Sequence, residues 1–259
     1  MNNDSNTPVI RDKADACVII PMYNECENAA AIIDAVMALP VLFDVLVIDD
    51  NSPDGTAAIV KDKMKQYAGR IDIIERAGKL GLGTAYIEGF RHCLAKGYEF
   101  ICEMDADFSH NPSDLLRLRQ TAIDESADVV VGSRYVTGVN VVNWPMGRIL
   151  MSYYASKYVR IVTGIPVHDT TAGFVCYRRK VLQAMDLDKI RFKGYAFQIE
   201  MKFTAYKYGF KIVEVPIIFV NRVLGTSKMN SGIFGEAVFG VIRLKWSSLF
   251  HKYPDYSHK

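Results

Sequence analysis

Two carboxylates at the end of an apolar stretch are the clearest chemical feature of the sequence. Asp105 and Asp107 are spaced i, i+2 after the mostly apolar run 100–104, and a turn-forming segment that ends in Pro112 follows them. Side chains two positions apart on an extended segment point the same way, so the pair can hold one hard divalent cation such as Mg²⁺ or Mn²⁺. An exposed acidic turn is the alternative explanation for so short a pattern.

The elements that position this pair are apolar strands that alternate with helices along the chain. Strands are expected at residues 16–20, 44–48, 71–75, 100–104 and 128–132, and helices at 29–39, 56–67, 84–96 and 114–125. Continuous apolar runs form strands that are buried on both faces, and strands that alternate with helices form mainly parallel sheets. The sequence therefore predicts an α/β fold in which helices cover both faces of a mainly parallel sheet.

Four of the expected strands end in residues that could bind a ligand, at the edge where such sheets bind ligands. These residues are Pro21, Tyr23, Glu25, Asp49, Asp50, Asp105, Asp107 and Arg134. Each has a structural explanation by itself, because Glu25 can be an acid at a helix start, Asp50 a turn residue and Arg134 a surface charge. Their convergence at one edge predicts a binding site. Residues 78–83 are rich in glycine but lack the ending of a P-loop, which indicates a flexible connection.

Charge and cysteine content restrict the partners. The chain has 259 residues and a net charge of +2, which does not indicate a nucleic-acid partner. The C-terminal part is basic, which suits phosphates or an anionic membrane surface; there Glu236 and Asp255 are outnumbered by Arg222, Lys228, Arg243, Lys245, Lys252 and Lys259. The five cysteines are scattered, without a Cys-x-x-Cys pair, which predicts buried free thiols in a reducing compartment.

Composition divides the chain into three parts. Residues 1–15 are a polar tail without the apolar core of a signal peptide, residues 16–230 carry the elements of one domain, and residues 231–259 are a basic amphipathic segment. Apolar residues keep helical spacing through 146–162 and 233–250, together with Trp, Tyr and basic residues. Such helices either pack on a core or lie in a bilayer surface. We expect peripheral membrane association, since no uncharged apolar run is long enough to span a bilayer.

Several longer segments follow one another in a characteristic order. They are 18–28 (VIIPMYNECEN), 47–56 (VIDDNSPDGT), 78–86 (GKLGLGTAY), 104–112 (MDADFSHNP), 131–135 (VGSRY), 169–174 (DTTAGF) and 194–200 (GYAFQIE). This series resembles the motifs of family 2 glycosyltransferases, and most of all those of the dolichol-phosphate (polyprenol-phosphate) mannosyltransferases. The resemblance covers about residues 16–230.

The resemblance implies a GT-A (Rossmann-like) fold that transfers mannose from GDP-mannose to a polyprenyl phosphate, with inversion and with Mg²⁺ or Mn²⁺. It implies that the guanosine is held by Pro21, Tyr23, Glu25, Ile48 and Asp50, and the metal-diphosphate by Asp105, Ala106 and Asp107. It also implies phosphate contacts from Arg134, Arg222 and Lys228. Ser109 stands where some relatives supply a Gln metal ligand, and Asn51 stands where many have Gly, which Asn can replace because it accepts left-handed geometry.

Some alternatives stay open at this point. Residues 222–228 hold Gly, Thr and Ser between two cations, which indicates a mobile loop that closes over anionic groups or a solvated basic loop. An Asp-x-Asp pair names neither base nor sugar, so a polyprenyl-phosphate glucosyltransferase that uses UDP-glucose is one alternative. A catalytically silent nucleotide-binding partner of a membrane complex is another. We expect the protein at the cytoplasmic face of the membrane, alone, as an oligomer or with a membrane-protein partner.

Overall fold

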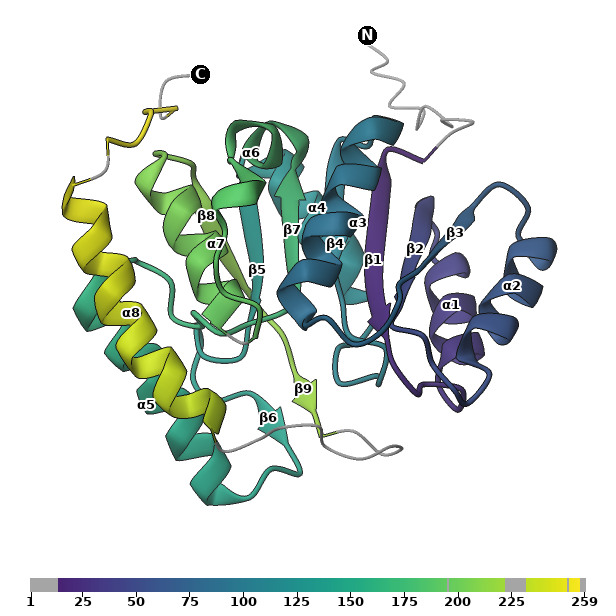
Figure 1. Ribbon diagram of the computed structural model, residues 1–259, viewed down its shortest axis with the longest axis horizontal. Helices are drawn as coiled ribbons and strands as arrows, with labels where there is room; N and C mark the ends of the chain where they lie inside the picture. The colour runs from purple at the N-terminus through teal and green to yellow at the C-terminus, as the bar shows by residue number, and fades with distance from the viewer. Residues whose placement is uncertain (1–13, 195, 222–231, 251, 257–259) are drawn as a thin grey trace, which may run out of the picture.

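The computed structural model describes residues 14–194, 196–221, 232–250 and 252–256 (Figure 1). Its main sheet has the order β3-β2-β1-β4-β7-β5-β8. The strands are β1 (Ala16–Met22), β2 (Phe43–Asp49), β3 (Ile71–Glu75), β4 (Phe100–Glu103), β5 (Val129–Ser133), β7 (Val175–Arg178) and β8 (Ile212–Pro216). The predicted strands are all present, and most neighbours in the sheet are parallel.

Strand β7 is the exception and was not predicted. It runs antiparallel to both β4 and β5 and lies between them. Its direction matters for function, because the beginning of β7 lies at the same sheet edge as the carboxyl ends of the other strands. The segment before β7, which contains Asp169, therefore reaches the edge at which ligands are expected.

Helices cover both faces of the sheet, as predicted. One core layer contains buried residues of α1 (Ala29–Met37), α2 (Thr56–Gln66) and α4 (Asp114–Asp124), packed on Val18 and Ile20 of β1. The other contains buried residues of α3 (Leu82–Lys96), α6 (Arg179–Ala184) and α7 (Ala196–Lys207), packed on Cys17 and Ile19. Successive side chains of β1 thus enter opposite layers, as the pleat of a strand requires. All five cysteines are free thiols, and only Cys26 is not buried.

Two long helices lie side by side at one margin of the sheet (Figure 1). They are α5 (Met146–Thr163) and α8 (Gly232–Phe250), close to the predicted bounds. Lys245 Nζ donates to the carbonyl oxygen of Thr163 at 3.2 Å, and Val241 packs with Val159 and Ile165 in a third apolar cluster. None of the described helices is long and apolar enough to cross a bilayer.

The helices α5 and α8 bury few large apolar residues. Ser156, Thr163 and Ser248 are buried against the protein, together with the smaller apolar residues Val159 and Val241. Large apolar residues are exposed instead: Met146, Leu150, Met151, Tyr153, Tyr154 and Ile161 on α5, and Phe239, Ile242, Trp246, Leu249 and Phe250 on α8. A soluble helix normally buries its apolar stripe. The described part of this pair leaves a broad apolar surface uncovered.

Residues 212–220 form two short strands, β8 and β9. β8 ends at Pro216, which has no N–H for the ladder. The chain then forms β9 (Phe219–Val220), which pairs with β6 (Val141–Val142) in a separate two-stranded sheet. The backbone N–H of Val220 donates to the carbonyl oxygen of Ser109 at 3.1 Å. β9 is therefore tied to the segment that carries the two predicted metal ligands.

Candidate active site

The Asp105-Ala106-Asp107 segment follows β4 at the ligand edge of the sheet. Ala106 is buried, whereas Asp105 and Asp107 are half-buried. The backbone N–H of Ser109 donates to Asp107 Oδ1 at 3.1 Å, and Phe108 between them has a φ of 57°. This tight turn ends the strand and fixes the orientation of the Asp107 carboxylate.

The donor set of this segment fits a hard divalent cation. In the described part of the chain, no group of three or more His, Cys, Asp or Glu side chains comes together around a common point. The protein would therefore supply two carboxylates, and Mg²⁺ and related ions commonly complete their shell with water and substrate phosphates. The Ser109 hydroxyl is buried and has no hydrogen-bond partner among the described residues. Such an orphaned oxygen beside Asp107 suits an additional ligand.

The segments after β1 and β2 are bonded to each other. The N–H groups of Asn24, Glu25 and Cys26 donate to Ser52 Oγ, Thr56 Oγ1 and Asp54 Oδ2, each at 3.0 Å. Thr56 in turn donates to Asp54 Oδ1 at 2.6 Å. Hydrogen bonds from Thr56 and Cys26 outweigh partial desolvation and lower the pKa of Asp54 to about 2. The predicted nucleoside residues are thus held on one cross-linked pair of loops.

The remaining predicted nucleoside residues lie on the same side of the sheet. Pro21 of β1 is directly opposite Ile48 of β2 in the register. Lys79 Nζ lies 5.2 Å from the ring centroid of Tyr23, and Asn28 Nδ2 donates to Glu25 Oε2 at 3.0 Å. The structure therefore places Pro21 beside Ile48, with Tyr23 and Glu25 in the segment that follows β1 at the same edge of the sheet. It also gives Asn51 a φ of 58°, the left-handed conformation expected where relatives have Gly.

Asp50 has a partner that the sequence did not reveal. Arg76 Nε donates to Asp50 Oδ1 at 2.6 Å, and Arg76 also donates to Thr84 Oγ1 at 2.8 Å. Burial raises the pKa of Asp50, while the Arg76 guanidinium acts in the opposite direction. Arg76 follows β3 at the same sheet edge, and that position was the signal available in the sequence. The pair links the loops after β2 and β3.

Arg134 is buried and joined to Asp169. Its Nε and Nη2 donate to the two carboxylate oxygens at 2.6 Å each, and its backbone N–H donates to Asp169 Oδ2 at 2.9 Å. Asp169 raises the pKa of Arg134 even though burial acts to lower it. The bidentate contact fixes the plane of the guanidinium. Arg134 thus lies at the sheet edge where it was predicted, in a fixed orientation.

A fully buried polar cluster lies below the Asp105 segment. Gln198 Nε2 donates to Glu103 Oε2 at 2.8 Å, and Lys202 Nζ donates to Gln198 Oε1 at 3.2 Å. Burial raises the pKa of Glu103 and lowers that of Lys202. The end of β4 and the 194–200 motif were the only signals of this contact in the sequence. The cluster anchors α7 to the strand that carries Asp105.

Aromatic side chains surround His110, which follows Asp107 and lies beside β9. The ring of the buried His110 stacks on Phe174 and meets the edge of Phe219, with centroid distances of 4.8 and 5.2 Å. Arg148, at the beginning of α5, lies 4.0 Å from the ring centroid of Trp144. Arg148 therefore adds a cation near β9 that the sequence did not single out. Arg222 and Lys228 lie outside the described residues, which stop at Asn221 in this region.

Comparison with known proteins identifies relatives over nearly the whole chain. The Glycosyl transferase family 2 model matches residues 17–185. A polyprenol monophosphomannose synthase of Mycolicibacterium smegmatis is 44% identical over 90% of this chain and 87% of its own length. An undecaprenyl-phosphate mannosyltransferase of Micrococcus luteus is 45% identical over 89% of this chain and 96% of its own length.

Solved structures with a similar fold are more distant in sequence. Glucosyl-3-phosphoglycerate synthase from Mycobacterium tuberculosis, solved with Mn²⁺, UDP and glucosyl-3-phosphoglycerate, has a TM-score of 0.64 at 17% identity, over 93% of this chain and 81% of its own. A mannosyltransferase from Pyrobaculum calidifontis, solved with GDP-Man and Mn²⁺, has a TM-score of 0.58 at 17% identity, over 93% of this chain and 66% of its own. At such identities the likeness concerns the fold, and the predicted GT-A fold is confirmed.

Proposed function

The chain belongs to glycosyl transferase family 2, and on this basis we propose that it transfers mannose from GDP-mannose to a polyprenyl phosphate with inversion. One observation carries the proposal: two polyprenyl-phosphate mannosyltransferases are 44% and 45% identical to this chain over almost its full length. The arrangement at the sheet edge suits this reaction, since a nucleoside side, a pair of carboxylates and a buried arginine follow one another there.

Each group has a role in moving a sugar off a nucleoside diphosphate. The cross-linked loops after β1 and β2, with the Asp50–Arg76 pair, hold the nucleoside, and Asp105, Asp107 and Ser109 hold the cation. A bound divalent cation, Mg²⁺ or Mn²⁺, neutralises the charge that develops on the leaving diphosphate. Arg134, oriented by Asp169, adds positive charge on the same side. The acceptor phosphate has a second pKa of about 6, so it is already mostly dianionic near neutral pH and needs no strong base.

Arg222 and Lys228 complete the proposed phosphate-binding set. The chain enters their segment at Asn221, directly after Val220, whose N–H bonds to the Ser109 carbonyl oxygen. Because this hydrogen bond brings the chain close to the Asp107 segment, we assign Arg222 and Lys228 to contacts with the donor or acceptor phosphates. Substituting Lys228 by Ala is expected to lower turnover, and unchanged turnover would count against the assignment.

Peripheral membrane association is the second part of the proposal. Ile161 is 75% exposed, Phe239 76% and Trp246 65%, so the apolar surface of α5 and α8 has no cover in the described chain. A polyprenyl acceptor must be reached at a bilayer surface, and exposed Trp, Tyr and Phe suit its interface. Residues 16–230 would form the catalytic domain and residues 231–259 the membrane-contacting segment, at the cytoplasmic face.

Thermal denaturation with nucleotides tests the donor. GDP, GDP-mannose, UDP and UDP-glucose are each added with and without Mn²⁺, to the wild type and to Asp107→Ala. A ligand at a hundredfold excess over its Kd adds about 2.7 kcal/mol to the free energy of unfolding. We expect metal-dependent stabilisation by the guanosine ligands only, and its loss in the variant. Stabilisation by the uridine ligands alone would assign a UDP-sugar donor, and none by any ligand would favour a silent nucleotide-binding partner.

A further inference from the structure

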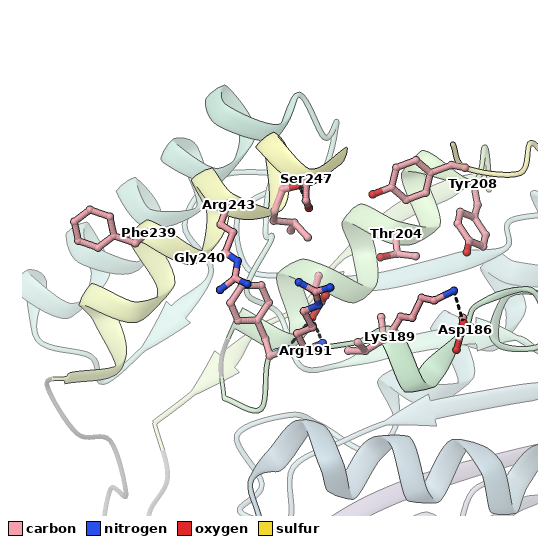
Figure 2. A pocket seen from close by; sticks show the side chains of 14 residues that line it. Asp186, Lys189, Arg191, Thr204, Tyr208, Phe239, Gly240, Arg243 and Ser247 are labelled. Atoms are coloured by element: carbon pink, nitrogen blue, oxygen red, sulfur yellow. Dashed lines mark hydrogen bonds and ion pairs between the residues drawn. The ribbon is translucent and has the colours of Figure 1, made fainter. Parts of the chain in front are cut away.

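A pocket of about 530 Å³ opens between α8 and the protein, away from the sheet edge (Figure 2). Its walls come from α8, from α7, and from the segment 186–192 that includes η1 (Leu187–Lys189). Volumes of this order accommodate small molecules and head groups. The backbone of α8 lies against the ring of Phe192, because a Cβ added to Gly240 would be only 2.6 Å from Phe192 Cε1. α8 therefore approaches the pocket wall as near as a glycine allows.

Two arginines, Arg191 and Arg243, line this pocket. Arg243 extends from α8 toward the segment that carries Arg191 (Figure 2). No ion pair or side-chain hydrogen bond joins either guanidinium to a described residue, although the positive charge of Arg191 acts on the Glu200 carboxylate and lowers its pKa against the effect of burial. The acids of the lining are already engaged: Asp186 pairs with Lys189 at 2.8 Å, and Glu200 accepts the N–H groups of Arg191 and Phe192 at 2.9 Å each. The pocket keeps a positive charge that its own acids do not neutralise.

The pocket is separate from the candidate active site. Helix α7 lies between the two: Gln198 donates to Glu103 of β4 and Lys202 donates to Gln198 and Ala172, whereas Glu200 and Thr204 line the pocket. Its other border continues into the apolar surface of α8, because Phe239 belongs to both. A ligand here would have its charged end beside Arg191 and Arg243, next to the surface proposed to meet the bilayer.

We propose that this pocket binds the phosphodiester head group of an anionic membrane phospholipid, apart from the acceptor lipid. The inference rests on the proposed membrane association. Arginine binds phosphate oxygens in a bidentate fashion, and two arginines on opposite walls can clamp one phosphate. The cytoplasmic leaflet is rich in anionic lipids, which attract basic groups at the surface. Acyl chains of the bound lipid would leave the pocket along Phe239. The site would fix the angle at which the protein lies on the membrane.

Binding of a monomeric short-chain lipid tests the pocket without a membrane. Dihexanoyl phosphatidylglycerol, below its micelle concentration, is titrated into the wild type, into Arg191→Gln/Arg243→Gln, and into the matched control Lys157→Gln/Arg160→Gln on α5. Dihexanoyl phosphatidylcholine and inorganic phosphate are the comparison ligands. We expect the wild type and the control to bind phosphatidylglycerol, and the pocket variant to bind it at least tenfold more weakly, because it lacks both charged donors to the phosphate.

Each other outcome overturns the proposal. Phosphatidylcholine has the same phosphodiester but also a choline cation, so its equal binding would show that the pocket does not select an anionic lipid, and equal binding of inorganic phosphate would show a site for free phosphate. Undiminished binding by the pocket variant, or no binding by the wild type, would remove the site. Mannose transfer by the pocket variant in detergent separates this inference from the proposed function, because neither arginine lies at the sheet edge. If the wild type binds the lipid but transfers no mannose, only the proposed function fails.

Discussion

Two ion pairs orient charged side chains of the site without a substrate. They are Asp50–Arg76 and Arg134–Asp169. Two of these residues were predicted from the sequence, and each turned out to be one half of an ion pair with a residue that follows or precedes another strand. Charged groups that are already oriented need little rearrangement when charge develops on a leaving diphosphate. At the scale of single residues, the charged side chains of the site are therefore oriented by ion pairs before a substrate binds.

The buried His110 makes stability depend on pH. Burial lowers its pKa to about 4, whereas a histidine in an unfolded chain titrates at about 6.5. Between these values the unfolded chain binds more protons than the folded one, so the free energy of unfolding falls as the pH falls through this window. The full effect is roughly 3 kcal/mol.

Urea denaturation of the wild type and of His110→Phe checks this prediction. Phenylalanine keeps the stacking on Phe174 and cannot titrate. The stability of the wild type relative to the variant should decline from about pH 6.5 to about pH 4. A difference that stays constant across this range would contradict the assigned pKa.

At the scale of elements, the loops after β1 and β2 depend on one hydroxyl. Thr56 is fully buried at the start of α2, accepts the Glu25 N–H and donates to Asp54. Thr56→Val keeps the volume but leaves the Glu25 N–H without its acceptor and removes one of the hydrogen bonds to Asp54, which keeps those from the N–H groups of Thr56 and Cys26. We expect a loss of about 1–3 kcal/mol in the free energy of unfolding and a higher KM for the donor. Chemical denaturation and donor titration measure both, with Thr121→Val on α4 as the control.

The pair α5 and α8 is the other element with a distinct role. Because Trp246 and Leu249 are exposed, Trp246→Ser/Leu249→Ser should leave the melting temperature nearly unchanged. It should weaken binding to vesicles at least about tenfold, since burying each large apolar side chain contributes about 1.5–3 kcal/mol. Flotation with vesicles measures the binding. Val241→Ser, in the buried cluster, is the control and should lower the melting temperature. Unchanged vesicle binding by the first variant would refute the role of this surface.

At the scale of the whole molecule, the sequence predicted the elements better than their pairing. The strands β1, β2 and β4 each carry their own apolar signal, and ligand residues at their ends follow from the parallel order. The four-residue strand β7 was missed, because its partners are distant in the chain and its direction is set by the sheet. The Asp50–Arg76 contact was missed for the same reason, since it depends on how two loops meet.

Periodicity had a further limit in α5 and α8. Helical spacing showed which side chains share a stripe, but it did not show whether that stripe faces the protein. In α5 the buried residues are Ser156, Val159 and Thr163, whereas the larger Ile161 is exposed. Only the packing of α5 against α8 and Val167 decides this arrangement. The pocket of Arg191 and Arg243, between α8 and α7, was likewise not indicated by any local pattern.

The central claim is that Asp105 and Asp107 serve the transfer of mannose to a polyprenyl phosphate. It is tested most directly by incubating radiolabelled GDP-mannose, Mn²⁺ and a polyprenyl phosphate with the wild type and with Asp107→Ala, and counting label in the lipid extract. We predict that the wild type labels the lipid and that the variant, folded as judged by its melting curve, is slower by about a hundredfold or more. A wild type that leaves the lipid unlabelled, or a variant that labels it at the wild-type rate, would contradict the account.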